Sequence, residues 1–559
     1  MTQSQLPHLP KLPQLSRRSL FKGAAIAAVS GGALSSLTAC GDGGSAGGGG
    51  GGAPGTGKSA AMPTYVRPNA PKPTYAGTPT GVMDVYASFP LDGKRSVHTE
   101  VGDGKDFEFL AMTYGQPAPP VSGNAYWQLL NKEMKLNIKG TLIPSGDFQT
   151  KFPALVAGND LPEVVSVPMY VQLSRLPQLV ESEFTDLSEH LAGDAVKKYP
   201  NLAGIQESGW ANAYFDGRIY GVPRSDPIFQ TLIYTKTDVI AKAGADAQPK
   251  NLAEFTALAK AVTDHRAGVY AFGGTDSGVP LANTLMMMFG VPNKWTKRSD
   301  GSFVAYFEHE QFIPSMDAIA KLFKAGYFHP DAPTMSKTQH DALFRAGKLV
   351  LMEEGNRAYG VVADDHDLEF GMMVPFEKDG GKPLYWENSG AYAVTMIKKD
   401  APKARVERFL RAMDYLSAPF GSYESLVINY GQKGPDYTVR SGTPVVSTRG
   451  QREMDLSIQF TVGGPQVLCY PQGTPGGDKL NWDWQTKVAP MFLKDPAVHL
   501  YSPTYDTKGA SLSQHMNDAM KAVVFGRAPA SSLKDAVRTW KQGGGDQMAR
   551  EYAESAKKS

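Results

Sequence analysis

Several short stretches of the chain combine flat aromatic side chains with planar polar groups. Aromatic rings can stack on the apolar C–H face of a sugar ring, and carboxylate, amide and guanidinium groups can hydrogen-bond to its hydroxyls. The candidate ligand-binding residues of this kind are Trp386, Glu387, Asn388, Tyr392, Arg224, Asp226, Gln230, Asp276, Glu354, Arg357, Trp482 and Trp484. For any one of these side chains, packing or a surface contact is the more common role, by roughly two to one, so the pattern supports the set more than any member.

Metal binding and catalysis have weaker support in the sequence. The ten histidines show no H-E-x-x-H motif or other paired spacing. The acidic turn from Asp364 to Asp367 lacks the glycine and the distal glutamate of a calcium loop. We therefore expect no metal, no cofactor and no catalytic residue. Carboxylates are numerous, however, and a glycosidase pair would be recognised only by its separation in space.

One nucleotide-binding motif is misleading. Residues Gly52 to Ser59 match the P-loop pattern letter for letter, but a polyglycine run precedes them and Pro63 follows closely. A P-loop needs a strand before it and a helix after it, because the phosphates sit at the helix N-terminus. We therefore do not expect nucleotide binding.

The stretch from Asp216 to Asp264 is the most regular part of the chain that could position these candidates. Ile219 to Val222 read as a short strand that stops at Pro223. Asn251 is expected to cap a helix, with Glu254 three residues later in a capping-box pattern. The apolar residues of this helix recur at helical spacing: Leu252, Phe255, Leu258, Ala259 and Val262. An extended segment interrupted by proline, between two α/β units, indicates a crossing between two lobes.

Strands and helices alternate in other parts of the chain. The patterns predict strands at 107–113 and 141–144, and helices at 124–134, at 148–157 and from Lys403 onward. The helix at 148–157 is expected to end at Gly158. This alternation favours an α/β fold with a mostly parallel sheet.

The N-terminus reads as an export signal. Arg17 and Arg18, followed by Leu20-Phe21-Lys22, resemble a twin-arginine signal, and the apolar run after them is too weakly hydrophobic for a membrane span. Leu37 to Cys40 resemble a lipobox, in which Cys40 becomes the first mature residue and carries the lipid. Residues 40–105 are then expected to form a Gly/Pro-rich tether.

Cysteine content and charge limit the other possibilities. The chain has only Cys40 and Cys469, so a lipidated Cys40 leaves no partner for an intramolecular disulfide. We expect Cys469 to be a small buried hydrophobe. The apolar fraction of 42% and the charged fraction of 20% suit a soluble globular chain. The net charge of +2, without a basic stripe, gives nucleic-acid binding no electrostatic support.

Several motifs resemble those of the sugar-binding extracellular solute-binding proteins of ABC importers. Asp216 to Pro223 and Tyr234 to Phe255 resemble a family pattern of D-G-K-hydrophobic-Y-G-hydrophobic-P followed by a strand that ends in Y-x-K-D. Leu161 to Val165 resemble the last part of a second family pattern, small–G–x–x–P-D-hydrophobic. Phe344 to Arg357 are similar to the family's F-x-x-G-K-x-A-M-x-x-x-G-x-W motif, with Arg357 in place of its tryptophan. Asn429 to Tyr437 resemble a motif of the large polysaccharide-fragment-binding lipoproteins of Gram-positive bacteria. Arg357 suggests an anionic ligand group, because a guanidinium fork suits a carboxylate.

The resemblance implies a two-lobed, type II periplasmic-binding-protein-like α/β fold whose hinge is crossed more than once, at Pro223 and Pro375. The domain boundaries that we expect are a signal peptide at 1–39, the lipid-anchored tether at 40–105, lobe 1 at 106–225, lobe 2 at 226–374, a return to lobe 1 at 375–418, and a return to lobe 2 with C-terminal helices at 419–559.

The resemblance also implies a function and partners. The protein is expected to be exported and monomeric, to sit on the outer face of the cell membrane through its lipid, a palmitate-type anchor, and to deliver a carbohydrate to ABC-transporter permease subunits. Ligand that contacts both lobes would favour their closure. Two alternatives remain open: a secreted glycosidase or polysaccharide lyase, and an envelope adhesion or structural lipoprotein.

Overall fold

A computed structural model gives the fold. It describes residues 60–78, 81–113, 118–145, 147–169, 171, 173, 175–229, 231–274, 278–356, 370–440, 442–454, 456–464, 466–469, 476–498 and 500–558. The export signal, Cys40, Gln230, Asp276 and Arg357 lie outside these ranges. Within them, no helix is both long enough and apolar enough to cross a lipid bilayer.

Lobe 1 is built on a five-stranded sheet with the order β3-β2-β4-β15-β7. Its strands are β2 (Asp106–Thr113), β3 (Asn137–Pro144), β4 (Val164–Pro168), β7 (Gly221–Ser225) and β15 (Ala391–Ile397). Strand β2 runs parallel to β3 and β4, whereas β15 is antiparallel to β4 and to β7. The sheet is therefore mostly parallel, as the sequence predicted; the reversed strand β15 was not part of that prediction.

Helices and two small hairpins complete lobe 1, and together with the sheet they enclose a hydrophobic core that we call the first core. The helices are α1 (Ala125–Met134), α2 (Phe148–Ala157), α3 (Leu176–Glu183), α4 (Ser188–Leu191), α5 (Glu207–Trp210), α12 (Lys403–Leu416), α13 (Tyr423–Tyr430) and α14 (Thr448–Glu453). The hairpins are β5 (Tyr214–Phe215) with β6 (Arg218–Ile219), and β16 (Tyr437–Arg440) with β17 (Thr443–Val446).

Lobe 2 is built on a separate four-stranded sheet with the order β13-β8-β12-β9. Its strands are β8 (Thr231–Lys236), β9 (Tyr270–Phe272), β12 (Leu349–Gly355) and β13 (Phe370–Met372), and it surrounds what we call the second core. Its helices are α6 (Thr237–Lys242), α7 (Leu252–Val262), α8 (Ala282–Met288), α9 (Phe312–Lys324), α10 (Lys337–Arg345), α15 (Gly477–Val488), α16 (Pro503–Val524), α17 (Leu533–Trp540) and α18 (Asp546–Lys558).

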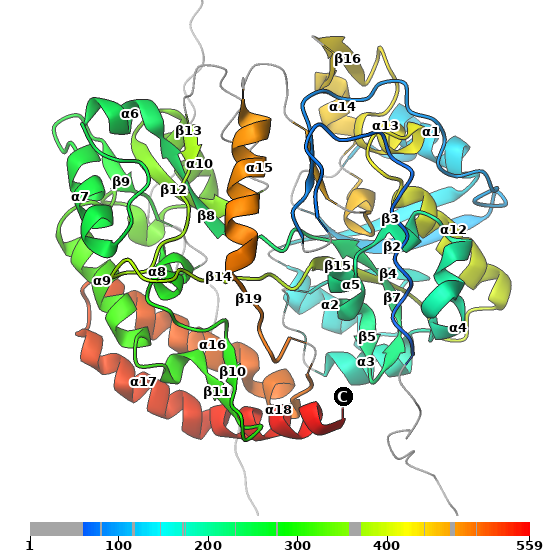
Figure 1. Ribbon diagram of the computed structural model, residues 1–559. Coiled ribbons are helices and arrows are strands. Elements are labelled where there is room, and N and C mark those ends of the chain that lie inside the picture. Colours follow the sequence, from blue (N-terminus) through cyan, green and yellow to red (C-terminus); the bar gives the residue numbers. More distant parts are fainter. Residues whose placement is uncertain are drawn as a thin grey trace, which may run out of the picture. The chain divides into compact units, whose positions relative to one another are not determined.

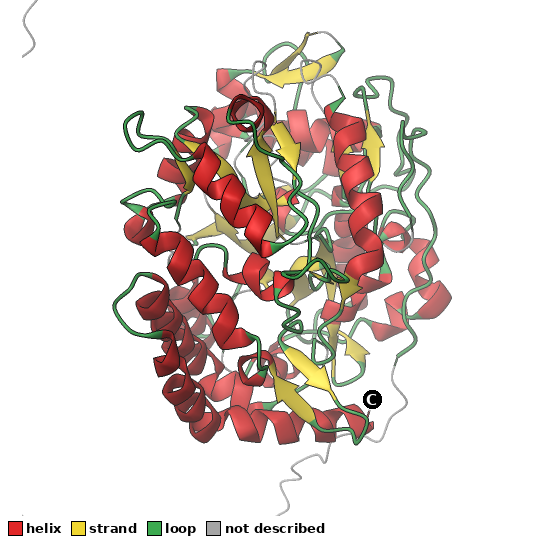
Figure 2. Cartoon of the chain, turned by 60° about the vertical axis from the view of Figure 1, so that its left-hand side comes forward, coloured by secondary structure: helices red, strands yellow, loops and turns green. Residues whose placement is uncertain are grey.

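Three small strand pairs accompany the second core: β1 (Asp84–Tyr86) with β18 (Val467–Cys469), β10 (Trp295–Lys297) with β11 (Phe303–Ala305), and β14 (Tyr385–Trp386) with β19 (Phe492–Leu493). Figure 1 labels the two sheets among their separate sets of helices. Figure 2 shows helices packed around the strands, with long loops between them.

Among the described residues from β2 onward, the chain passes between the lobes along three segments. The first leads from β7 to β8, the second from β13 to β15, and the third follows Phe460 toward β18 and α15. The return to lobe 2, expected at residue 419, comes later. Val427 and Ile428 are buried in the first core, because α13 packs its apolar face there, and Val462 is also buried in this core.

The described residues of the segment expected to be a tether pack against the rest of the chain. The residues from 60 to 105, which we call the N-terminal arm, first meet lobe 1, where the Val66 amide donates to the Ala203 carbonyl over 2.8 Å. Val82, Met83 and Val85 are then buried in the second core. The glycine and proline content of this region predicted a coil, but its apolar residues are numerous enough to pack.

The structure confirms some of the helix and strand ends predicted from the sequence and corrects others. The Asn251 cap is confirmed, since its side chain accepts from the Glu254 amide, and the predicted apolar face of α7 is buried or partly buried. The short strand does not stop at Pro223, which lies inside β7; an edge strand tolerates proline because one of its sides has no ladder to complete. Helix α2 ends at Gly158, but the left-handed residue is Asn159, with φ 55°.

Helix α12 holds a buried carboxylate that generates a test of stability. Asp414 is 5% exposed, and its Oδ1 accepts from the backbone amides of Asn201 (2.8 Å) and Leu202 (3.1 Å). Burial raises the pKa of Asp414 to about 6. A folded-state pKa above the unfolded value means that the stabilising contribution is complete below about pH 4 and is lost as the pH rises through about 6.

We predict that Asp414→Asn raises the free energy of unfolding by about 1–3 kcal/mol at pH 8, because an amide oxygen keeps both hydrogen bonds without a buried charge. The difference should shrink toward zero near pH 4, where the carboxyl is protonated. Urea denaturation at both pH values measures it. An equal effect at the two pH values would contradict the buried-charge explanation.

Candidate functional site

The three crossing segments meet at one place, which we call the crossing cluster. The Ser225 amide donates to the Gly463 carbonyl (3.3 Å), and the Asp226 amide donates to the Gly390 carbonyl (2.9 Å). Gly390 has φ +85°, and a Cβ there would lie 2.8 Å from the Ser208 backbone, so only glycine fits comfortably. Residues far apart in the sequence are thereby held together between the two sheets.

Arg224 is the charged centre of this cluster. It is 7% exposed, and its Nε donates to the Gln459 carbonyl over 2.8 Å. The guanidinium carbon lies 5.1 Å from the ring centroid of Tyr392 and 5.3 Å from that of Phe460. Both distances suit cation–π attraction. Arg224 and Tyr392 are both candidate ligand-binding residues from the sequence analysis, and they are in contact in the structure.

Asp226 and Asn388 form a second polar pair in the cluster. The Asn388 Nδ2 donates to Asp226 Oδ2 (3.2 Å) and to the Pro227 carbonyl (3.3 Å). The Asn388 backbone amide donates to the Ile228 carbonyl over 2.9 Å. The first and second crossings are therefore joined through backbone and side chain, and the orientation of the Asn388 amide is fixed.

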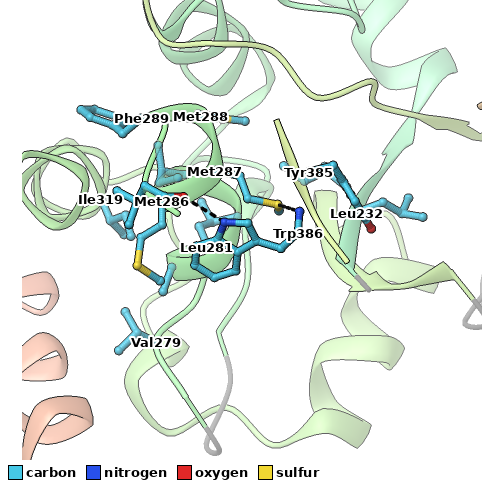
Figure 3. Packing of buried hydrophobic residues seen from close by; sticks show 14 of the residues in the cluster. Leu232, Val279, Leu281, Met286, Met287, Met288, Phe289, Ile319, Tyr385 and Trp386 are labelled. Atoms are coloured by element: carbon cyan, nitrogen blue, oxygen red, sulfur yellow. Dashed lines mark hydrogen bonds between the residues drawn. The ribbon is translucent and has the colours of Figure 1, made fainter. Parts of the chain in front are cut away.

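Glu387 and Trp386 precede Asn388 but have different surroundings. The Glu387 carboxylate lies 3.8 Å from the Lys494 Nζ, and burial raises its pKa while Lys494 opposes the rise. Trp386 is 4% exposed and its Nε1 donates to the Val291 carbonyl over 2.9 Å. Figure 3 shows its indole among the second-core residues Leu281, Met286 and Met287. The structure thus places Trp386 in the core.

The remaining described candidates lie in lobe 2. Glu354 pairs with the Lys337 Nζ at 2.8 Å and accepts from the Gly355 amide. Both tryptophans of the Asn481–Trp484 stretch lie on α15. Trp484 is buried and donates to the Met373 carbonyl, whereas Trp482 donates to the Ala76 carbonyl of the N-terminal arm (3.0 Å). Gln230, Asp276 and Arg357 lie outside the described residues and stay predictions.

Sequence reasoning missed several polar and aromatic residues. Phe460 and Gln459 belong to no motif and carry no spacing signal. Three buried side-chain atoms here and nearby have no hydrogen-bond partner among the residues that the structure describes: Ser225 Oγ, Gln459 Oε1 and Asn356 Nδ2. Buried polar atoms usually find a partner in the protein or in ordered water, and atoms of this kind also occur elsewhere in both lobes, at Trp210 Nε1 for example.

The arrangement offers binding groups. A buried guanidinium between two aromatic rings, with polar atoms close by, suits a polar ligand with flat apolar faces. Among the described ranges, no group of three or more histidine, cysteine or acidic side chains is placed to hold a metal ion.

The contact between Arg224 and Phe460 generates a prediction. In a double-mutant cycle of Arg224→Gln and Phe460→Leu, we expect a coupling of about 0.5–2 kcal/mol in the free energy of unfolding, because the ring and the cation attract each other. Pairing Arg224→Gln with Phe303→Leu, in the second core, is the control and should be additive. Additivity in both cycles would show that the Arg224–Phe460 contact contributes nothing.

Comparisons with known proteins agree with this architecture. The profile of the family described as bacterial extracellular solute-binding protein matches residues 118–414, more than half of the chain. The polygalacturonan/rhamnogalacturonan-binding protein YtcQ of Bacillus subtilis is 25% identical over 484 residues, which cover 81% of this chain and 91% of that protein. The lipoprotein LipO of the same organism is 22% identical over 460 residues, covering 78% and 89%.

Solved structures support the same fold. The alginate-binding protein AlgQ2 aligns with a TM-score of 0.59 at 15% identity, covering 84% of this chain and 99% of that one. An HMO-binding, ABC-transporter-associated solute-binding protein from Bifidobacterium longum infantis aligns with a TM-score of 0.61 at 12% identity, covering 82% and 99%. The two-lobed α/β fold expected from the sequence is thereby confirmed.

Proposed function

The chain belongs to the bacterial extracellular solute-binding protein family, and from this premise we propose that it binds an oligosaccharide between its lobes and delivers it to the permease of an ABC transporter. The observation that carries the proposal is the crossing cluster. Arg224 of β7, Tyr392 of β15 and Phe460 meet there, each close to the lobe 1 end of a different crossing segment. A ligand that touches this cluster and both lobes would favour the closed arrangement of the lobes by its binding energy.

The names of relatives support a carbohydrate ligand. One relative is named for binding polygalacturonan and rhamnogalacturonan, and one solved neighbour for binding alginate. Polygalacturonan and alginate carry carboxylates along the chain. The guanidinium of Arg224 at the crossings, and that of Arg357 predicted from sequence, are the groups of this chain that suit such ligands.

We also propose that the protein is exported through its twin-arginine signal and anchored by a lipid on Cys40. Its relative LipO is named a lipoprotein. The tether between Cys40 and the N-terminal arm would then be shorter than the sequence suggested, because the arm packs from residue 60. Monomeric state and permease partners belong to the same proposal.

In this proposal no bond is made or broken. A secreted glycosidase or lyase remains the rival enzyme, and an adhesion or structural lipoprotein the rival without a small-ligand site. The crossing cluster favours binding over the structural role, because a guanidinium and two aromatic rings gather where the crossing segments meet.

A thermal-shift screen over neutral and uronic-acid oligosaccharides tests the proposed function. We expect at least one oligosaccharide to raise the melting temperature in proportion to the logarithm of its concentration, because a ligand that binds the folded state stabilises it. The same mixtures, analysed for products, should show none. Turnover would establish the enzyme, and the absence of any shift would favour the structural lipoprotein.

The predicted role of Arg357 gives a second test. Arg357→Ala should weaken binding of a uronate oligosaccharide roughly 10- to 100-fold, since a charge-assisted hydrogen bond is lost, and should change neutral-sugar binding far less. Arg298→Ala, in the turn between β10 and β11, is the matched control and should change neither. Calorimetric titration measures both. Equal losses for charged and neutral sugars would reject the anionic-group hypothesis.

A further inference from the structure

A chain of buried side-chain amides connects the N-terminal arm to the end of β12. The Met83 amide donates to Gln485 Oε1 (2.8 Å), the Gln485 Nε2 donates to Asn481 Oδ1 (2.9 Å), and the Asn481 Nδ2 donates to Asn356 Oδ1 (3.0 Å). Gln485 and Asn481 are 0% exposed and Asn356 is 1% exposed. Because all three side chains are buried, these hydrogen bonds are not exchanged with water.

We call Gln485, Asn481 and Asn356 the amide relay. The Met83 amide determines which end of each side-chain amide donates and which accepts. The Met83 backbone N–H can only donate, so Gln485 must present its oxygen to the arm and its NH2 group to Asn481. Asn481 and Gln485 lie one helical turn apart on the buried face of α15, so the NH2 group of Gln485 reaches the oxygen of Asn481. Asn481 then has its NH2 group left to donate to Asn356. Asn356 therefore receives a hydrogen bond on its oxygen and keeps its NH2 group for another partner.

That NH2 group has no acceptor among the residues that the structure describes. The rest of Asn356 is held firmly, since its backbone carbonyl accepts from the Tyr234 hydroxyl over 2.8 Å. Asn356 directly follows β12, at the carboxyl end of a strand that lies between β8 and β9 in the lobe 2 sheet. In open α/β sheets, ligands bind outside the carboxyl ends of the strands.

We propose that Asn356 Nδ2 donates a hydrogen bond to a carboxylate oxygen of a bound uronate oligosaccharide, and that Gln485 and Asn481 are positioning residues that hold this donor toward the ligand. The inference rests on the proposed function and specifies its ligand class. A hydroxyl can rotate to donate or accept, but a carboxylate oxygen only accepts, so a donor of fixed direction favours the carboxylate. The arm becomes part of the binding device, because its Met83 amide fixes that direction.

Gln485→Glu tests the relay without touching the ligand. In its ionised form the new carboxylate would only accept, so Asn481 would turn its NH2 group toward it and present its oxygen to Asn356. Asn356 would then turn its own NH2 group inward and present an oxygen to the ligand. In its protonated form the new carboxyl can donate through its hydroxyl and would restore the original direction. Binding by this variant should therefore depend on pH in a way that a packing defect would not.

Several charged groups on the elements around Gln485 already have partners, whereas Asp478 and Lys487, also on α15, form no ion pair with another described residue and lie outside its buried face. Asp84 of β1 pairs with Arg67 at 3.2 Å, and Lys479 pairs with Asp483 on α15 at 2.5 Å. On β12, Glu353 accepts from the Leu281 amide and the Thr284 hydroxyl, and Glu354 pairs with Lys337. We therefore expect burial to be the main influence on the pKa of a glutamate at position 485. Burial raises that pKa above its ordinary value.

The experiment is calorimetric titration of the full mature chain with a linear oligogalacturonate from about pH 5 to about pH 9, a window that brackets a buried glutamate. Gln485→Glu should bind like the unchanged protein at the acidic end and roughly 10- to 100-fold more weakly at the basic end. Gln248→Glu is the control: this glutamine also bridges a backbone amide and a carbonyl in lobe 2, at Val374 and Met372, but lies outside the relay. It should follow the unchanged protein throughout.

A second variant guards against a folding defect. Gln485→Met keeps the volume but makes no hydrogen bond, so the Met83 amide should exchange hydrogen faster and oligogalacturonate binding should fall without a new pH dependence. Loss by the same factor at every pH in Gln485→Glu, or unchanged binding in both variants, would overturn the relay alone. If the unchanged protein binds a neutral sugar but no oligogalacturonate, the ligand class is wrong. If it binds no sugar, the proposed function fails as well.

Discussion

The constraint on which the structure depends is the meeting of three crossing segments between two independently built cores. Each lobe has its own sheet and its own buried residues, and backbone hydrogen bonds from Ser225 to Gly463 and from Asp226 to Gly390 hold the crossings together. Relative motion of the lobes must therefore be absorbed in a few residues. A ligand that contacts the crossing cluster would contact the residues that connect the two lobes. Ligand binding and the relative position of the lobes can therefore be coupled.

Several polar groups near this joint are buried, and in the part of the chain that the structure describes some of them are unpaired. Arg224 is nearly buried between Tyr392 and Phe460, and Ser225 Oγ and Gln459 Oε1 lack hydrogen-bond partners within the described residues. Burial of unpaired polar atoms costs about 1–3 kcal/mol each. A bound sugar, rich in hydroxyls, would recover part of that energy. The N-terminal arm adds a second connection, because it packs on lobe 1 and then on the second core before reaching β2.

Sequence reasoning was most successful where burial has a period. The apolar face of α7, the helix from Lys403 onward and the Asn251 cap all follow from spacing and capping chemistry. It failed where packing depends on partners distant in the chain. The glycine and proline content of the arm predicts a tether, whereas its apolar residues pack on both cores. The sequence does not say which core α13 joins, and Val427, Ile428 and Val462 lie in the first core instead of the expected second one.

The candidate site was predicted only in part for the same reason. Arg224, Asp226, Asn388 and Tyr392 meet as a group, but Trp386 and Trp484 are buried in the second core, and Gln459 and Phe460 had no recognisable signal. Asn481, Trp484 and Gln485 lie on the buried face of α15. Only the two-residue spacing of Trp482 and Trp484 was considered from the sequence, so this helical face was not recognised. Polar residues at apolar positions of a helix are therefore a useful signal for such relays.

The most direct measurement of the central claim is the distance between the lobes with and without sugar. Fluorescent labels at Lys132 on α1 and Lys260 on α7, both exposed, would report it by energy transfer. We predict that a bound oligosaccharide shifts the distribution toward a single, different distance and that the shift saturates with the binding curve. Saturable binding with an unchanged distance would show that the lobes do not close on the ligand and would contradict the account.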